Sequence, residues 1–212
     1  MSMIATYEEF VAEECYGLTS EVTDEYTVSN PTPGAIYNAV MLHHYVRTEF
    51  DDQPRDHAVE PLQTFSETWH REEGNCEELS VLLCSLLRQV PDHRTRFVTV
   101  DNDECQGHAL LQINFTGVDD PERVARLLRI AHKYIEEIDR STDEIHWETE
   151  GDDHWFVADP IKSEYIGDVA RHVDEGYVHT DGGAWQWHRV KDRGNGIGRE
   201  APPPAELARR HG

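Results

Sequence analysis

The sequence predicts one α+β domain in which helices come first and pack on one side of an antiparallel sheet. Apolar residues recur at helical spacing between positions 35 and 90, whereas a period of two dominates from 97 to 115. A chain of 212 residues can also form one ordinary core without disulfides or metals. We expect an N-terminal lead-in over 1–33, the domain over 34–190, and a disordered acidic, Pro-rich tail over 191–212.

Helices are expected before the sheet. After the breaker at 30–34, apolar residues share one face over 35–50, and a second stripe runs from Pro61 until it stops at Gly74. Asn75 is a candidate N-cap with Glu78 three residues later, which is the spacing of a capping box. The apolar helix that follows ends before Pro91, so we expect it to be the central buried helix.

Strands are expected from Phe97 onward. The first covers 97–100, and the second covers 108–115 with His108, Leu110, Gln112 and Asn114 on one face and Ala109, Leu111, Ile113 and Phe115 on the other. A helix at 123–138 lies within an insertion of about 119–140. Two strands at 145–149 and 155–158 and a last strand at 184–190 complete the predicted sheet.

The charge balance excludes one class of partner. The chain has 42 acidic and 19 basic residues, a formal net charge of -23, and only three lysines. A polyanion would be repelled, so we expect no nucleic-acid partner. Acidity along the whole chain together with an arginine bias is typical of proteins from salt-in halophiles of the haloarchaeal type, although an acidic protein of an ordinary cytosol fits the same composition.

The cysteine usage and the N-terminus bear on location. The four cysteines have no CxxC spacing, and the first ten residues lack a basic region followed by an apolar stretch. We therefore expect no signal peptide, no membrane span and a cytoplasmic location with free thiols, while a viral particle stays open.

Three residues occur in the order that a Cys-His-Asp acyl-transfer site needs. Cys76 opens the central helix, His108 begins a strand, and Asp159 ends a strand immediately before Pro160. A helix N-terminus and a histidinium neighbour can lower the pKa of a thiol, although Glu77 and Glu78 oppose this. The backbone N–H of Cys76 could stabilise an oxyanion.

The motifs Gly74-Asn75-Cys76, Gly107-His108-Ala109 and 155–160 (WFVADP) resemble the transglutaminase-like core of the papain-like cysteine enzymes over about residues 34–165. The resemblance implies Cys76 as nucleophile, His108 as general base and acid, and Asp159 as the orienting group. Trp69, Asn75 and Gly107 are the candidates for oxyanion or substrate contacts. Hydrolysis of a peptide or amide is the expected reaction, with transamidation as a second outcome, a protein or peptide as substrate, and no cofactor.

Other interpretations of these residues stay open. Cys76 could be a structural thiol, His108 a half-buried strand histidine, and Asp159 a turn residue. The fold could then be a non-catalytic scaffold or a subunit of a larger, even viral, assembly. A zinc site of Cys76, His108 and Asp159 fits in composition but is less favoured than a triad, so we expect no metal. Cys15, Cys84 and Cys105 are expected to be structural.

Overall fold

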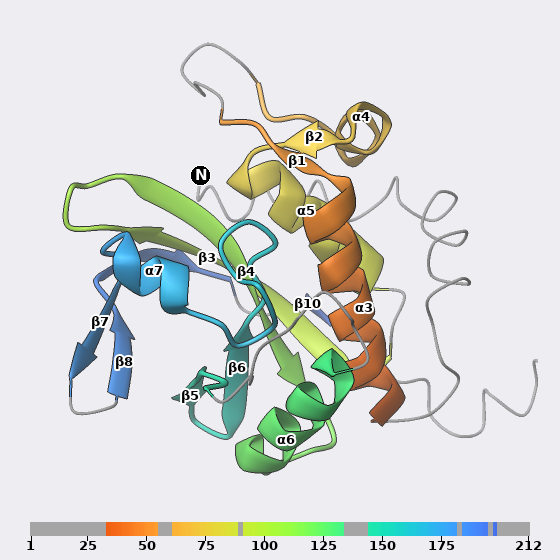
Figure 1. The fold of residues 1–212 in the computed structure, drawn as a ribbon, viewed down its shortest axis with the longest axis vertical. Coiled ribbons are helices and arrows are strands. Elements are labelled where there is room, and N and C mark those ends of the chain that lie inside the picture. The colour runs from red at the N-terminus through yellow and green to blue at the C-terminus, as the bar shows by residue number, and fades with distance from the viewer. Residues whose placement is uncertain are drawn as a thin grey trace, which may run out of the picture.

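The computed structural model describes residues 33–54, 61–88, 91–133, 144–181, 184–194 and 197–198. Helices lie on one side of a curved antiparallel sheet, and a small hairpin with a short helix lies on the other side (Figure 1). This is the α+β architecture that the sequence predicts. The lead-in before Pro33, Cys15 within it, and the tail beyond Gly198 fall outside the described residues.

Side-chain N-caps start three of the five described helices, namely α4, α5 and α6. The bounds of the five helices are α3 (Pro33–Glu49), α4 (Phe65–Arg71), α5 (Cys76–Leu87), α6 (Pro121–His132) and α7 (Ala170–Asp174). The stripe from Pro61 becomes helical only at Phe65, because Thr64 and Glu67 form a capping box there. The predicted capping box of Asn75 and Glu78 is confirmed at the start of α5.

The main sheet has the strand order β10-β3-β4-β6-β5, and β9 also pairs with β3. Its strands are β3 (His93–Asp101), β4 (Gly107–Phe115), β5 (Trp147–Glu150), β6 (Asp153–Val157), β9 (Arg189–Arg193) and β10 (Ile197–Gly198). All of these pairs are antiparallel. Two small sheets pair β1 (Asp51–Asp52) with β2 (Glu73–Gly74) and β7 (Val178–Asp181) with β8 (Ala184–Trp187).

The sheet separates two apolar clusters. Alternate residues of β4 point to opposite faces, so Leu111 and Ile113 pack with α3, α5 and α6, whereas Leu110 packs with Tyr177 and Trp187 on the hairpin side. The predicted alternation of β4 is therefore confirmed. His108, the second residue of β4, lies on the same face of the strand as Leu110.

The C-terminal region differs from the prediction. The expected strand at 184–190 is two strands that separate at His188: β8 pairs with β7, and β9 pairs with β3. Residues 191–193 and 197–198 belong to strands, so the prediction of disorder over this part of the tail is wrong. Within the described part of the chain, no helix combines the length and apolar character needed to cross a membrane.

Candidate active site

The first turn of α5 positions Cys76 through side-chain capping. Asn75 Oδ1 accepts hydrogen bonds from the backbone N–H groups of Glu77 (2.9 Å) and Glu78 (3.0 Å), and the Glu78 carboxylate accepts one from the N–H of Asn75 (2.9 Å). Gly74 is closely packed, since a Cβ there would lie 3.0 Å from Glu78 Cβ and the neighbouring atoms would have to shift to make room for it. These contacts fix the backbone on both sides of Cys76.

His108 and Asp159 meet across the sheet as the sequence predicts. His108 Nε2 donates a hydrogen bond to Asp159 Oδ2 at 2.5 Å. Asp159 follows β6, which is the neighbour of β4 in the sheet, so the pairing of these two strands brings the residues together. With Nε2 committed to the carboxylate, Nδ1 is the ring nitrogen of His108 that remains for chemistry.

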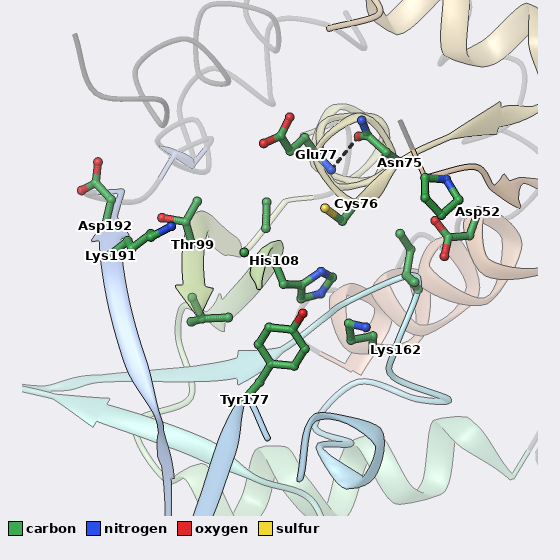
Figure 2. A pocket seen from close by; sticks show the side chains of 15 residues that line it. Asp52, Asn75, Cys76, Glu77, Thr99, His108, Lys162, Tyr177, Lys191 and Asp192 are labelled. Carbon is green, nitrogen blue, oxygen red and sulfur yellow. Dashed lines mark hydrogen bonds between the residues drawn. The ribbon is translucent and has the colours of Figure 1, made fainter. Parts of the chain in front are cut away.

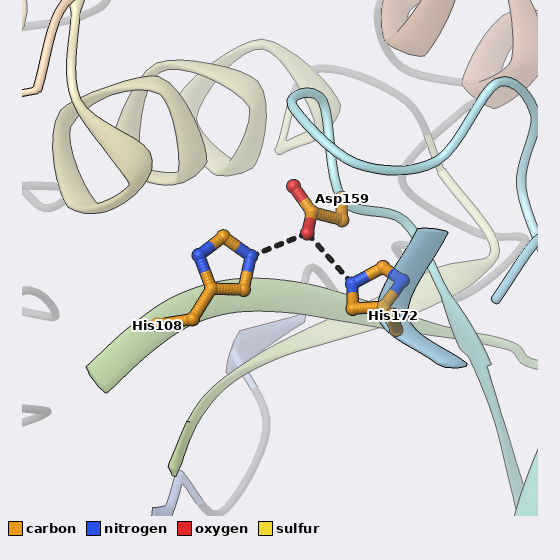
Figure 3. Close-up of side chains that lie close together, drawn as sticks. All are labelled: His108, Asp159 and His172. Atoms are coloured by element: carbon orange, nitrogen blue, oxygen red, sulfur yellow. Dashed lines mark hydrogen bonds and ion pairs between the residues drawn. The ribbon is translucent and has the colours of Figure 1, made fainter. Parts of the chain in front are cut away.

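Asp159 is fully buried and ionised. Its Oδ1 accepts hydrogen bonds from the backbone N–H groups of Ile161 (2.9 Å) and Lys162 (3.3 Å), and its Oδ2 accepts a second one from His172 Nε2 at 2.9 Å (Figure 3). Burial alone would raise the pKa of this carboxyl, but the charge of His108 and the hydrogen bonds from both histidines hold it well below its usual range.

Cys76 and His108 line one pocket of about 660 Å³. Figure 2 shows the Cys76 sulfur, the His108 ring and the Tyr177 hydroxyl directed toward the same space. Asp52, Lys162, Lys191 and Asp192 also line this pocket, which gives it walls of mixed charge.

The pKa of the Cys76 thiol is raised, whereas a helix N-terminus and a histidinium neighbour would lower it. Burial, reinforced by the negative charges of Glu77, Asp159 and Asp52, raises its pKa to about 12, and a hydrogen bond from the backbone N–H of Ala109 offsets this only in part. Burial therefore outweighs this single hydrogen bond, and the raised pKa makes Cys76 a neutral thiol at pH 7. Any reaction at this sulfur needs a base to take its proton.

The other candidate residues divide into two groups. Asn75 and Gly107 line the pocket. Trp69 is absent from the described lining: its ring stacks on Phe65 with centroids 5.9 Å apart and lies 5.7 Å from Phe50, within an aromatic cluster beside α3. Proximity in sequence to Cys76 is thus misleading for Trp69, which we remove from the oxyanion candidates.

Three residues that contribute to the site were missed. His172 contacts Asp159, Tyr177 lines the pocket with its ring 5.4 Å from the His108 ring, and His43 Nε2 donates a hydrogen bond to the backbone oxygen of Asp159 at 3.1 Å. His43 falls on the inward stripe of its helix, which marks it only as buried. No local pattern distinguishes His172 or Tyr177.

The zinc ligand set that the composition allows does not form as one cluster. Among the described residues, the single group of three possible ligands is His108, Asp159 and His172, whose ligand atoms lie within 4.8 Å of one another. Cys76 does not belong to it. The closeness of the three has a direct explanation without a metal, because two N–H donors share one carboxylate oxygen.

Cys84 is a buried thiol and Cys105 is an exposed one. Cys84 is fully buried in α5 with its Sγ 3.2 Å from Thr95 Oγ1. Cys105 is exposed in the β3–β4 connection and has a positive φ of 62°. Both are free thiols, as the sequence predicts.

The comparisons with known proteins give only a distant likeness. No protein-family model and no curated protein matches the chain. Among solved structures, calcium-bound Legionella pneumophila LapG aligns over 99% of each chain, and EGTA-treated LapG over 87% of this chain and 85% of its own. Both have a TM-score of 0.41 and 10% identity. A likeness at this level is too weak to support a family or an activity, so only the geometry of the site bears on its chemistry.

Proposed function

We propose that this protein is a transglutaminase-like cysteine enzyme that transfers an acyl group through Cys76, with His108 as base and then acid and Asp159 as the orienting group. One observation carries the proposal. An ionised, buried carboxylate holds His108 by Nε2, and the same imidazole lines a pocket with the only described cysteine that opens a helix. Each of the three side chains comes from a different element.

The raised pKa of Cys76 determines how the reaction starts. Because the thiol is neutral, His108 Nδ1 removes its proton as the sulfur attacks the substrate carbonyl, and Asp159 stabilises the imidazolium that forms. Asn75 Oδ1 occupies the N–H groups of Glu77 and Glu78, so the first-turn donor for the oxyanion is the N–H of Cys76. His108 then gives the proton to the leaving amine, which leaves a thioester.

Hydrolysis is the outcome that the pocket favours. Release of the thioester to an amine requires the amine to compete with water, which needs a dry and selective channel. Here Asp52, Lys162, Lys191 and Asp192 line the pocket, and charged groups of this kind keep water close. We therefore propose cleavage of a peptide or amide bond, with a protein or peptide as substrate.

Thiol alkylation followed by peptide mapping tests this function without a known substrate. Iodoacetamide at pH 7.5 should label Cys76 faster than the exposed Cys105 and the buried Cys84. His108→Gln keeps an amide donor for Asp159 but offers no base, and it should slow labelling of Cys76 by at least tenfold while leaving Cys105 unchanged. Preferential labelling of Cys105 in the native protein would overturn the proposal.

A peptide-library digest read by mass spectrometry tests turnover itself. The native protein should cleave members of the library, and Cys76→Ser should not. A second candidate function is a non-catalytic scaffold, which is favoured by the burial of the Cys76 thiol that raises its pKa to about 12. A scaffold predicts an unreactive Cys76 together with no difference between the native protein and Cys76→Ser in the digest.

A further inference from the structure

We infer that His172 is a positioning residue for this site: it holds the Asp159 carboxylate so that Asp159 presents a fixed acceptor to His108. This role rests on the proposed function. His172 lies on α7, on the hairpin side of the sheet, and is fully buried. It does not belong to the described residues that line the pocket, so it would act on a substrate only through Asp159 and His108.

The four donors around Asp159 explain why His172 is needed. Oδ1 is held by the N–H groups of Ile161 and Lys162, while Oδ2 receives His108 Nε2 and His172 Nε2. Without His172, only His108 would hold Oδ2, and that imidazole must itself change charge during the reaction. A donor that takes no part in the proton transfer keeps the carboxylate oriented through both protonation states of His108.

The surroundings of His172 leave it one described polar contact. Its Nδ1 is buried without a hydrogen-bond partner among the described residues, and its ring meets the Trp187 ring edge-on at 5.6 Å. A buried polar side chain with one ring nitrogen left unsatisfied costs stability. The hydrogen bond to Asp159 is therefore the contact that accounts for a polar residue at position 172.

The segment that carries His172 is fixed to the loop after Asp159 at further points. Glu175 forms an ion pair with Lys162, and the Lys162 ammonium lies 5.1 Å from the centre of the Tyr177 ring. Arg171 donates a hydrogen bond to the backbone oxygen of Ile161 at 3.3 Å. Several contacts thus fix the position of α7 against residues 159–162. These contacts keep His172 next to Asp159.

Alkylation kinetics with three variants test this role. His172→Leu removes the donor, His172→Gln places an amide N–H at a similar reach, and His132→Leu is the matched control, since His132 is equally buried but has no described polar partner. His172→Leu should lower the rate constant for Cys76 labelling at least tenfold. His172→Gln should recover most of that loss, and His132→Leu should keep the native rate.

Two results would overturn the role of His172. One is a native rate in His172→Leu, and the other is a rate for His172→Gln as low as that of His172→Leu, since a purely space-filling residue gains nothing from the restored donor. If His172→Leu fails to fold, nitrogen-15 NMR of the native protein decides. The proton of His172 should then be on Nε2, and a proton on Nδ1 instead would contradict the hydrogen bond to Asp159.

A bound metal is the rival explanation of the same cluster. Elemental analysis of the purified protein and titration with zinc chloride should show no stoichiometric metal held by His172, whereas stoichiometric zinc that is lost in His172→Gln would replace the positioning role.

The positioning role and the proposed enzyme function can fail independently of each other. If Cys76 and His108→Gln behave as expected and only His172→Leu does not, the positioning role alone is wrong. If native Cys76 is unreactive, the enzyme proposal fails, while NMR still reports the contact between His172 and Asp159.

Discussion

His43 on α3 and Asp159 after β6 are 116 residues apart in sequence and are joined by a hydrogen bond from His43 Nε2 to the Asp159 backbone oxygen. Burial lowers the pKa of His43 to about 4, so the ring is neutral at pH 7 and one of its nitrogens carries the donated proton. The helix that packs on the sheet thus fixes the backbone of the residue that orients His108. The core and the candidate site are coupled at this point.

Replacing His43 should therefore affect stability and reactivity together. His43→Leu leaves the buried oxygen of Asp159 without this donor, which costs about 1–3 kcal/mol of unfolding free energy. Labelling of Cys76 should also slow, because Asp159 is less well held. His43→Gln, which retains an N–H donor, is the control and should lose less of both. Urea unfolding and alkylation rates measure the two effects, and a loss of stability with a native labelling rate would separate the core from the site.

Stability should fall as the pH drops from about 6.5 toward 4. Burial lowers the pKa of His43 and His93 to about 4 and of His132 to about 3, below the unfolded value near 6.5. Between these values the unfolded chain binds more protons than the folded one, so acid favours unfolding. The low pKa of Asp159 acts in the same direction, but only at still lower pH.

The pH dependence can be measured by urea unfolding at half-unit steps from pH 7.5 to 4. His132→Leu removes one of the buried groups and should flatten the decline, whereas replacement of the exposed His179 should not. Each of the three buried histidines should contribute up to a few kcal/mol by pH 4, since a tenfold difference in proton affinity between the folded and unfolded chain corresponds to about 1.4 kcal/mol. A stability that is level down to pH 4.5 would contradict this assignment.

Much of the site could be predicted because its features are local. The capping box depends on a three-residue spacing, and the alternation in β4 determines which face carries His108. The contact between His108 and Asp159 follows once the two strands are taken as neighbours. The capping box and the alternation need no knowledge of the wider packing, whereas this contact depends on the long-range pairing of β4 with β6.

The remaining features depend on distant packing. His172 lies on a five-residue helix whose sequence has no periodicity, and its contact with Asp159 exists only because α7 covers the far side of the sheet. The pKa of Cys76 could not be read from its helical position, since its largest cause is burial, which depends on the packing around the thiol. The separation of the expected strand 184–190 into β8 and β9 at His188 could not be predicted, because local alternation does not say which strand is the partner.

A side chain at Gly74 should destabilise the protein. A Cβ at this position would lie 3.0–3.2 Å from side-chain atoms of Glu78, Thr68 and Leu79, which are closely packed at the start of α5. Gly74→Ala should lower the unfolding free energy by about 1–3 kcal/mol through overpacking. Gly107→Ala is the matched control, because a Cβ there meets nothing closer than 3.6 Å. Equal stability of the two variants in urea would show that the start of α5 can adjust.

Salt should stabilise the fold. A formal net charge of -23 makes the compact state repel itself, and the screening length falls from about 10 Å at 0.1 M to about 3 Å at 1 M ionic strength. The melting temperature should rise steeply between 0.1 and 1 M KCl. Chloride and sulfate compared at equal ionic strength separate screening, which they share, from surface exclusion, in which they differ. A melting temperature unchanged by KCl would remove the physical basis for proposing salt adaptation.

The pH profile of Cys76 labelling should reveal the base. With a thiol pKa of about 12, roughly one sulfur in ten thousand is a thiolate at pH 8. In His108→Gln only that thiolate reacts, so the rate should rise about tenfold per pH unit from 6 to 10. In the native protein the imidazole of His108 takes the proton during attack, so the rate should depend on pH less steeply than in His108→Gln. Cys105, followed in the same samples, reports any general effect of pH on the reagent. Superimposable profiles for the native protein and His108→Gln would mean that His108 does not act on this sulfur, although both residues line the same pocket.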